Sequence, residues 1–298
     1  MTQFEKKIIA TWGDAGKAWL ESLPQKIKEL SEEWELYKLK PHTHLSYNYV
    51  ASGYSRAYTD KVILKIGFDS KELEQEAAAL EWYNGNGCAR LLEHDFERAA
   101  LLIEDVIPGT MLKTLFPHED EAAILRITQV MKQLHVKPLQ QHEQFPTLED
   151  WLKPLSTSST SQDFEKHRLK ALELSNYLLA TQDKTVLLHG DLHHENLLSS
   201  QRHGWLAIDP KGVIGEPLYE VGACIRNPIE QLIKEENIPA ILERRIELFA
   251  EKLRSDTQRI HDWSYVQAVL ATFWCNYDKK SQARWIKIAK ALAALPCK

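Results

Sequence analysis

The spacing of apolar residues changes from strand-like to helical near residue 110, and this change limits the folds open to the chain. From 42 to 66, β-branched and aromatic residues flank the small, polar segment "ASGYS", and a turn-like "TD" precedes "KVILKI". This pattern predicts a strand, a tight loop at "ASGYS" and more strand. Two further short strands are predicted within "ARLLEHDFERAALLIEDVIPG". The predicted strands therefore gather in the N-terminal third of the chain.

Helical spacing dominates the rest of the sequence. In the N-terminal third, helices are predicted over 14–39 and within 70–87, where a double Asn-Gly ends the second one. Beyond residue 110, helices are predicted over 119–136, 163–182, 220–253 and 261–295, with a break near Pro228. Short strands and loops interrupt this pattern from 185 to 215. An α+β part followed by a mostly helical part is expected, and a cleft between two unequal lobes is a natural ligand site.

Composition argues against several classes of protein. Lysine and arginine number 37 and aspartate and glutamate 42, for a formal net charge of −5. Nucleic acid is therefore not expected as a partner, because phosphate backbones bind to basic surfaces. No two of the four cysteines form a Cys-x-x-Cys pair, which argues against a disulfide framework. The sequence has no signal peptide and no run near the ~20 apolar residues that span a bilayer. We expect a cytoplasmic protein without a membrane partner.

Three histidines, an aspartate, a glutamate and an asparagine lie between two leucine pairs in "LLHGDLHHENLLSS", residues 187–200. Three interpretations are open. His189 and Asp191 can simply close a turn by bonding to backbone groups. His189, His193 and His194 with Asp191 could bind zinc, although adjacent histidines seldom reach one ion from an irregular loop. The third interpretation is phosphoryl transfer.

The spacing of Asp191 and Asn196 favours phosphoryl transfer. Their order matches the H-R-D-x-x-x-x-N loop of kinases, in which the carboxylate orients the attacking hydroxyl and accepts its proton. A neutral oxygen ligand for magnesium is needed just beyond that carboxylate. Asp209 follows the apolar segment "WLAI" and would join Asn196 in supplying the oxygen ligands that a hard dication prefers.

The N-terminal third contains the complementary residues. Lys65 lies on the apolar segment "VILKI", Glu76 lies within the helix that follows, and "ASGYSRAY" offers a small-residue turn whose amides could cover phosphate. Each has a simpler explanation: a strand-edge lysine, a solvated helix charge and a hairpin glycine (Gly53). Five elements in the right order are harder to explain separately.

On "HGDLHHENLL", "AIDPKGVIGEPLYEVG" and "RNP", the chain resembles the aminoglycoside phosphotransferases of the protein-kinase-like superfamily. More narrowly, it resembles the aminoglycoside/hydroxyurea antibiotic-resistance kinases of the streptomycin 6-kinase type. The resemblance implies a bilobal protein-kinase-like α+β fold, with a small N-lobe of antiparallel sheet plus helix and a larger, mainly helical C-lobe. It implies an N-lobe over 1–102, a hinge over 103–107 and a C-lobe over 108–298. The absence of the kinase His-Arg-Asp arginine and of an Ala-Pro-Glu motif points to a small-molecule kinase.

The resemblance also implies a role for each matching residue. Asp191 would be the catalytic base, Asn196 and Asp209 would bind Mg²⁺, and Lys65, held by Glu76, would grip the phosphates of ATP. The remaining nucleotide contacts would come from two segments, one covering the phosphates and one forming the adenine-binding hinge: Ser52, Gly53, Tyr54 and Ser55, then Ile103, Glu104, Asp105 and Val106.

Other residues near these motifs have less certain roles. His189 and Glu220 are expected to brace the catalytic loop, His193 and His194 are loop braces before they are ligands, and Lys211 is either a charge-stabilising residue or a surface lysine. Carboxylates and tryptophans of the helical lobe are available for a cationic substrate, although the motif does not fix them: Glu216, Glu230, Asp262, Trp263 and Trp274. Trp263 and Trp274 have the spacing typical of core residues.

The leading functional hypothesis is an ATP- and Mg²⁺-dependent kinase of an aminoglycoside-like antibiotic, acting as a monomer or homodimer. A kinase of another small hydroxylated metabolite uses the same chemistry, so the nucleotide-binding residues cannot distinguish the two. A nucleotide-binding pseudoenzyme is the third possibility, and the joint presence of Lys65, Asp191, Asn196 and Asp209 counts against it.

Overall fold

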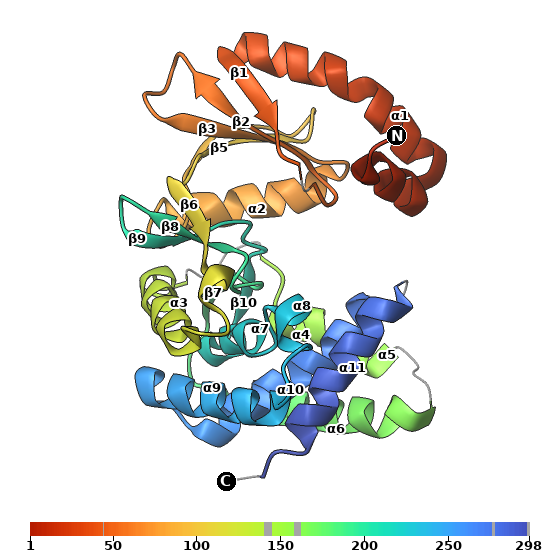
Figure 1. Ribbon diagram of the computed structural model, residues 1–298, viewed down its shortest axis with the longest axis vertical. Helices are drawn as coiled ribbons and strands as arrows, with labels where there is room; N and C mark the ends of the chain where they lie inside the picture. The colour runs from red at the N-terminus through yellow and green to blue at the C-terminus, as the bar shows by residue number, and fades with distance from the viewer. Residues whose placement is uncertain (44, 140–144, 158–161, 276–277, 297–298) are drawn as a thin grey trace. The chain divides into compact units, whose positions relative to one another are not determined.

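The computed structural model describes residues 1–43, 45–139, 145–157, 162–275 and 278–296. The chain divides into two compact units, Met1–Gly109 and Thr110–Lys298 (Figure 1). The first is built on an antiparallel sheet and the second is mostly helical, as the predicted kinase-like α+β fold requires. The functional boundaries predicted above, with a hinge at 103–107, stay a prediction. No helix among the described residues is both long and apolar enough to cross a bilayer.

The first unit is a five-stranded sheet with strand order β1-β2-β3-β5-β4, in which each neighbouring pair is antiparallel. Helices α1 and α2 lie on opposite sides of this sheet (Figure 1). The elements are α1 (Gln3–Glu33), β1 (Leu36–Pro41), β2 (Tyr49–Ser55), β3 (Lys61–Ile66), α2 (Ser70–Tyr83), β4 (Leu91–Asp95) and β5 (Ala100–Glu104).

Strand β3 places its side chains alternately on the two faces of the sheet. Val62, Leu64 and Ile66 are fully buried and join a core cluster with residues of α1, including Trp19. The intervening Lys65 consequently points to the other face, where α2 packs. Because side chains alternate between the two faces of β3, Lys65 lies on the face opposite the apolar core cluster.

Two sequence predictions in this unit are wrong. The helix predicted over 14–39 begins at Gln3 and ends at Glu33, with non-helical backbone at Gly13, and Leu36–Pro41 forms β1 instead. Leu36 is buried and pairs with Ser55, so tertiary pairing overrides the helical spacing of this segment. The tight loop predicted at "ASGYS" is also wrong, because these residues continue β2 and pair with β1 on one edge and with β3 on the other.

The second unit consists of helices around two short β ladders, β7 with β10 and β6 with β8 and β9. Its strands are β6 (Pro108–Met111), which crosses the boundary between the units, β7 (Val186–Leu188), β8 (Leu197–Ser200), β9 (Gly204–Ala207) and β10 (Val213–Gly215). Its helices are the 3₁₀ helices η1 (Leu112–Leu115) and η2 (Pro217–Glu220), and α3 (Asp120–Leu134), α4 (Leu148–Leu152), α5 (Pro154–Thr157), α6 (Gln162–Ala180), α7 (Val221–Ile225), α8 (Ile229–Leu232), α9 (Ile238–Leu253), α10 (Thr257–Trp274) and α11 (Lys279–Ala293).

The break predicted near Pro228 is confirmed, because α7 ends at Ile225 and Pro228 precedes α8. The helices predicted at 220–253 and 261–295 are each divided further. Asn237 caps α9 by accepting a hydrogen bond from the amide of Ala240, and Asp278 caps α11 in the same way, through the amide of Lys280. Polar caps therefore start new helices where apolar spacing alone suggested continuity.

Arg245 of α9 is fully buried and joins three segments of the second unit. Its guanidinium donates to both carboxylate oxygens of Asp120, at 2.6 to 3.2 Å. It also donates to the carbonyl oxygens of Cys224, Ile225 and Asn227, at 3.2, 2.9 and 2.6 Å. This arrangement fixes the backbone after α7, which carries Arg226.

We expect Arg245→Ala to lower the free energy of unfolding by about 3–5 kcal/mol, because it leaves the Asp120 carboxylate buried without its main partner. The matched control is Arg244→Ala, since Arg244 contacts the same carboxylate at 3.0 Å from a side chain that is 47% exposed. That variant should lose no more than about 1 kcal/mol. Urea unfolding of both variants measures the difference, and equal losses would contradict this account of the pair.

Candidate active site

The loop between β7 and β8 is held by one buried carboxylate. Glu220, at the end of η2, accepts hydrogen bonds from the backbone amides of His189 at 2.7 Å and Gly190 at 2.9 Å. Only 1% of Glu220 is exposed. Amides so aligned stabilise a carboxylate that burial would otherwise penalise. The predicted bracing role of Glu220 is confirmed.

His189 and Gly190 form the entry to this loop. The fully buried His189 ring bonds through Nε2 to the carbonyl oxygen of Ile208 at 2.8 Å, and its Nδ1 accepts from the amide of Asp191 at 3.3 Å. Its predicted structural role is therefore confirmed. Gly190 has φ +85°, and an added Cβ would lie 2.6 Å from the ring of Trp151. Only glycine fits both the backbone conformation and the space.

Asp191 and Asn196 are in contact within the second unit, and Asp209 follows the strand that pairs with the one after Asn196. The side-chain amide of Asn196 donates to the backbone oxygen of Asp191 at 2.9 Å, which leaves its carbonyl oxygen as the group that could bind a cation. Ile208 donates its amide to the backbone oxygen of Asn196 at 3.0 Å. Asp209 therefore lies two residues past the end of β9, next to the residue whose amide binds Asn196. Asp209 has φ +59°, a conformation that aspartate tolerates better than most residues.

The three histidines of the loop diverge from one another. His189 bonds to Ile208, the Nδ1 of His193 accepts from the amide of Glu195 at 3.2 Å, and His194 is fully buried. Among the described residues, no group of three His, Cys, Asp or Glu side chains could hold a metal ion. The zinc interpretation is thus unsupported, whereas Asn196 and Asp209 offer the oxygen atoms that Mg²⁺ prefers.

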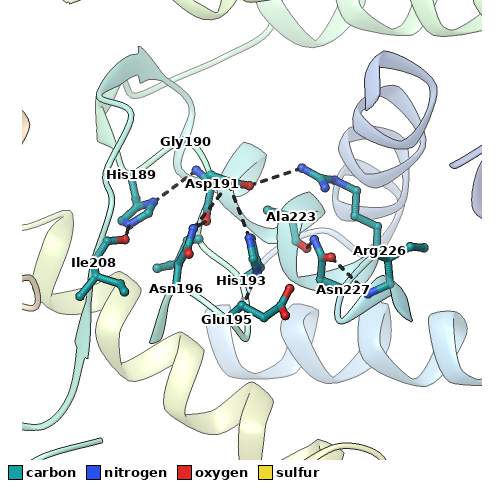
Figure 2. Close-up of polar contacts among 12 residues, drawn as sticks. His189, Gly190, Asp191, His193, Glu195, Asn196, Ile208, Ala223, Arg226 and Asn227 are labelled. Carbon is teal, nitrogen blue, oxygen red and sulfur yellow. Dashed lines mark hydrogen bonds and ion pairs between the residues drawn. The ribbon is translucent and has the colours of Figure 1, made fainter. Parts of the chain in front are cut away.

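Two basic side chains face Asp191 (Figure 2). His193 Nε2 lies 3.5 Å from one carboxylate oxygen and Arg226 Nη2 lies 3.8 Å from the other. Partial burial opposes ionisation of Asp191, but His193, Arg226 and His189 outweigh it and hold the pKa of this carboxyl below its usual range. Asp191 is therefore ionised at neutral pH.

Lys65 and Glu76 form the predicted ion pair in the first unit. The ammonium Nζ lies 2.8 and 2.6 Å from the two carboxylate oxygens, and both residues are buried. Lys65 and Glu76 belong to the first unit, whereas Asp191, Asn196 and Asp209 belong to the second. The convergence of the two sets on one triphosphate stays a prediction.

The other predicted nucleotide contacts lie in strands. Ser52 and Ser55 use their hydroxyls within the first unit, to His42 Nε2 at 2.5 Å and to the carbonyl oxygen of Trp34 at 2.8 Å. Gly53 packs closely against Leu39, and Tyr54 stacks on Tyr37 with ring centroids 5.5 Å apart. The prediction that these amides bind phosphate assumed a turn at 52–55. The structure has no turn there, because these residues pair with β1 and β3.

The predicted hinge residues lie at the end of β5. The amides of Glu104 and Asp105 donate to the carbonyl oxygens of Arg90 and Lys61, each at 3.0 Å. Ile103 and Val106 are buried. Burial raises the pKa of Asp105, although Lys61 and His42 oppose the shift. The amides of Glu104 and Asp105 are thus already used, and Ile103 lies within the paired strand β5. The adenine-binding role of this segment stays a prediction.

A cavity of about 640 Å³ opens beside Asp191 within the second unit. Residues that the sequence reasoning assigned no role line it: Trp151, Glu195, Arg226 and Trp285. Lys211 and Trp274 line it as well. Trp274 is 39% exposed, so the expectation that it is a core residue is wrong. "RNP" was the only sequence signal that pointed at Arg226.

The other substrate candidates lie away from this cavity. Trp263 is fully buried and donates to Glu216 at 2.8 Å, and Arg259 binds the same carboxylate at 2.5 and 2.7 Å. Asp262 is buried and accepts from Gln258, and Glu230 pairs with Arg284. Glu216 and Asp262 therefore serve the packing of the helical unit, whereas Glu230 forms its ion pair from a side chain that is 60% exposed. Trp263 is a core residue as predicted.

A sequence profile of the aminoglycoside/hydroxyurea antibiotic resistance kinases matches residues 50–279. The chain belongs to this family. It is accordingly a phosphotransferase whose acceptor group is an alcohol, the enzyme class that the sequence predicted.

Curated relatives of this kinase cover nearly its whole length. Streptomycin 6-kinase of Streptomyces griseus is 25% identical over 287 residues, which cover 94% of this chain and 92% of the relative. Hydroxyurea phosphotransferase of Kitasatospora aureofaciens is 26% identical over 266 residues, covering 88% and 76%. Two members with different acceptors in their names therefore resemble this kinase almost equally.

Solved structures show the same fold. Choline kinase LicA from Streptococcus pneumoniae superposes with a TM-score of 0.66 at 17% identity, covering 92% of this kinase and 99% of that chain. Aminoglycoside phosphotransferase APH(4)-Ia, in a ternary complex with ADP and hygromycin B, gives 0.65 at 15% identity, covering 90% and 99%. At such identities the likeness establishes the fold alone.

We expect Glu220→Gln to lower the kcat of this kinase about 10- to 100-fold, because one loop amide loses its charge-assisted acceptor. Glu216→Gln is the control, since it removes another buried carboxylate charge without touching the loop. It should lower stability but leave kcat within about threefold. Steady-state kinetics and thermal melting of both variants test this. An unaffected kcat in Glu220→Gln would show that the loop does not need the carboxylate.

We expect Arg226→Gln to shift the acid limb of kcat/KM to higher pH. The pKa of Asp191 is depressed in the wild type, so its carboxylate persists above that depressed pKa and is lost only as the pH falls through it. Removing the guanidinium raises that pKa toward the ordinary value of about 3.9. A pH–rate profile measures the shift, and a movement toward lower pH would contradict the assignment.

Proposed function

We propose that this kinase transfers the γ-phosphate of ATP, in the presence of Mg²⁺, to a hydroxyl group of an aminoglycoside-type antibiotic such as streptomycin. The observation that carries the proposal is the position of Asp191. It is an ionised carboxylate at the edge of a 640 Å³ cavity, in contact with an asparagine that has an oxygen to offer a cation. The cytoplasmic location and the monomer or homodimer state predicted from the sequence belong to the same proposal.

Asp191 would accept a hydrogen bond from the acceptor hydroxyl and orient its oxygen toward the γ-phosphorus. Asn196 and Asp209 would hold Mg²⁺, which supplies charge neutralisation at the phosphates when it is bound. Lys211 lies next to this loop, since its amide donates to the carbonyl oxygen of His189 at 2.7 Å. Its ammonium group is a candidate for stabilising the transferred charge.

In the first unit, Lys65 would contact the nucleotide phosphates while Glu76 holds it in place. Ile103 to Val106 would bind adenine through backbone atoms. Val106 is the donor we favour there, because no backbone partner for its amide is found among the described residues. Ser52, Gly53, Tyr54 and Ser55 would cover the phosphates from within a strand.

The test is phosphate transfer by the full-length protein with ATP and Mg²⁺, followed by mass spectrometry of streptomycin and of a panel of other hydroxylated compounds. Transfer to streptomycin would support the proposal. Transfer only to other compounds would leave the kinase but change its acceptor. ATP binding without transfer to any compound would favour a pseudoenzyme.

We expect Asp191→Asn to reduce phosphate transfer about 10²- to 10⁴-fold, because the amide cannot accept the hydroxyl proton. ATP affinity should stay within about threefold, since the substitution spares Lys65 and both proposed Mg²⁺ ligands. Asp183→Asn, at an exposed aspartate ahead of β7, is the control and should behave as the wild type. Undiminished transfer by Asp191→Asn would remove Asp191 from the reaction.

A further inference from the structure

A second hollow of the mostly helical unit, called here the α3–β9 concavity, lies where α3 packs against β9 (Figure 1). It has a volume of about 530 Å³. Its lining residues come from α3, from the turn that joins β8 to β9 and from β9 itself: Arg126, Gln129, Val130, Lys132, Gln133, His203, Gly204 and Trp205. Among the residues that the structure describes, the two hollows share no lining residue. The α3–β9 concavity is therefore separate from the cavity beside Asp191.

The wall of the α3–β9 concavity is positively charged. Arg126 and Lys132 are its cations, and no aspartate or glutamate is found among the described residues that line it. The chain as a whole has a formal net charge of −5, so this wall differs in sign from the average surface. Cations that share one hollow without a carboxylate repel each other, and an anion that enters relieves the repulsion. The charge of the wall therefore favours a negative ligand.

The two cations keep hydrogen-bond donors for such a ligand. Arg126 Nη1 donates to the side-chain oxygen of Gln129 at 3.3 Å, and Lys132 Nζ donates to the carbonyl oxygen of Lys252, also at 3.3 Å. Both acceptors are neutral, so neither contact cancels the charge of its donor. A guanidinium has five N–H donors and an ammonium has three. Each side chain can therefore bind an anion and keep its present contact.

The turn between β8 and β9 supplies the rest of the wall. Ser200 pairs with Gly204 across this turn, and its Oγ accepts a hydrogen bond from the amide of Arg202 at 3.1 Å. These contacts fix the backbone on both sides of His203, whose imidazole can donate to an anion. Trp205 is partly buried and adds an aromatic surface. The concavity thus combines basic groups of a helix with an imidazole and an indole held by a short turn.

We propose that the α3–β9 concavity is an anion site that binds a small ligand with two linked phosphate groups. A phosphate group carries about 1.5 to 2 negative charges at pH 7 and three acceptor oxygens. It therefore offers more charge and more acceptors than a carboxylate, and two linked groups can contact Arg126, Lys132 and His203 together. The volume of about 530 Å³ lies within the usual range for small-molecule sites. This site plays no part in the proposed phosphate transfer and is tested independently of it.

The test is calorimetric titration of the full-length protein with pyrophosphate, at an ionic strength near 0.15 M that screens non-specific attraction. Arg126→Gln and Lys132→Gln should each weaken binding about tenfold, and the double variant about a hundredfold, because each change removes one charge-assisted contact. Pyrophosphate that binds at the proposed nucleotide site would be unaffected, so the component lost in these variants measures the new site. Unchanged pyrophosphate binding in the double variant would overturn the proposal.

The matched control combines Lys17→Gln with Lys28→Gln. Both lysines are exposed on α1, and their replacement changes the net charge by the same amount as the double variant. The control should bind pyrophosphate as the wild type does, and an equal loss would show that only the overall charge matters. Lys132→Arg retains the cation and should keep binding within about threefold, which separates loss of charge from a folding defect.

Comparison with ADP identifies the source of the phosphates. Pyrophosphate and ADP share two linked phosphates, and ADP adds a base that can stack on Trp205. If the concavity takes nucleotides, ADP should bind about tenfold more tightly than pyrophosphate, and Trp205→Leu should remove the difference. Equal affinity would assign the site to the phosphates alone. In either case the binding must be lost in the Arg126→Gln, Lys132→Gln double variant, and its persistence there would refute the site.

Discussion

The geometry of the site depends on a single buried carboxylate. Glu220 accepts hydrogen bonds from two successive backbone amides, those of His189 and Gly190. These bonds orient the backbone between the end of β7 and Asp191. Burying a charge in this position is costly unless hydrogen-bond donors replace the lost water. The amides of His189 and Gly190 are such donors, and they are available because Gly190 adopts a positive φ angle beside Trp151. The buried charge of Glu220 therefore depends on the backbone conformation that Gly190 allows, and that conformation is in turn held by Glu220.

A second buried charge acts on the same aspartate through Arg226. Arg245 fixes the carbonyl groups on either side of Arg226, and Asp120 neutralises the buried guanidinium. Arg226 is consequently presented to Asp191 and to Trp285 by backbone that cannot easily move. The electrostatics of the Asp191 carboxylate thus depend on an ion pair that does not touch the cavity.

What could be predicted from the sequence was the set of residues whose partners are fixed by local spacing or by a neighbouring motif. Lys65 and Glu76 lie on one strand and the helix that follows it, and Asp191 and Asn196 share one loop. The errors arose where distant segments compete. Residues 36–41 have helical spacing, but pairing with β2 makes them a strand, and the same pairing converts the expected loop at 51–55 into strand.

The cavity was missed for a related reason. Trp151, Arg226 and Trp285 come from three separate stretches of the chain, and no spacing rule connects them. Glu216 and Asp262 carry the negative charge expected of a site for a cationic substrate. In the structure, however, Glu216 binds Arg259 and Asp262 binds Gln258. Only the folded chain distinguishes a carboxylate that has a partner from one that a ligand can reach.

The low pKa of Asp191 limits the chemistry that this residue can perform. A carboxylate that holds its charge so firmly is a weak base, so it cannot deprotonate an alcohol before the phosphorus is attacked. Phosphoryl transfer does not require early deprotonation, because its loose transition state demands little of the nucleophile. In the proposed reaction, Asp191 would then orient the hydroxyl, and the proton would move late. His193 and Arg226, which depress the pKa, favour that role because they keep the acceptor oxygen of the hydrogen bond charged at neutral pH.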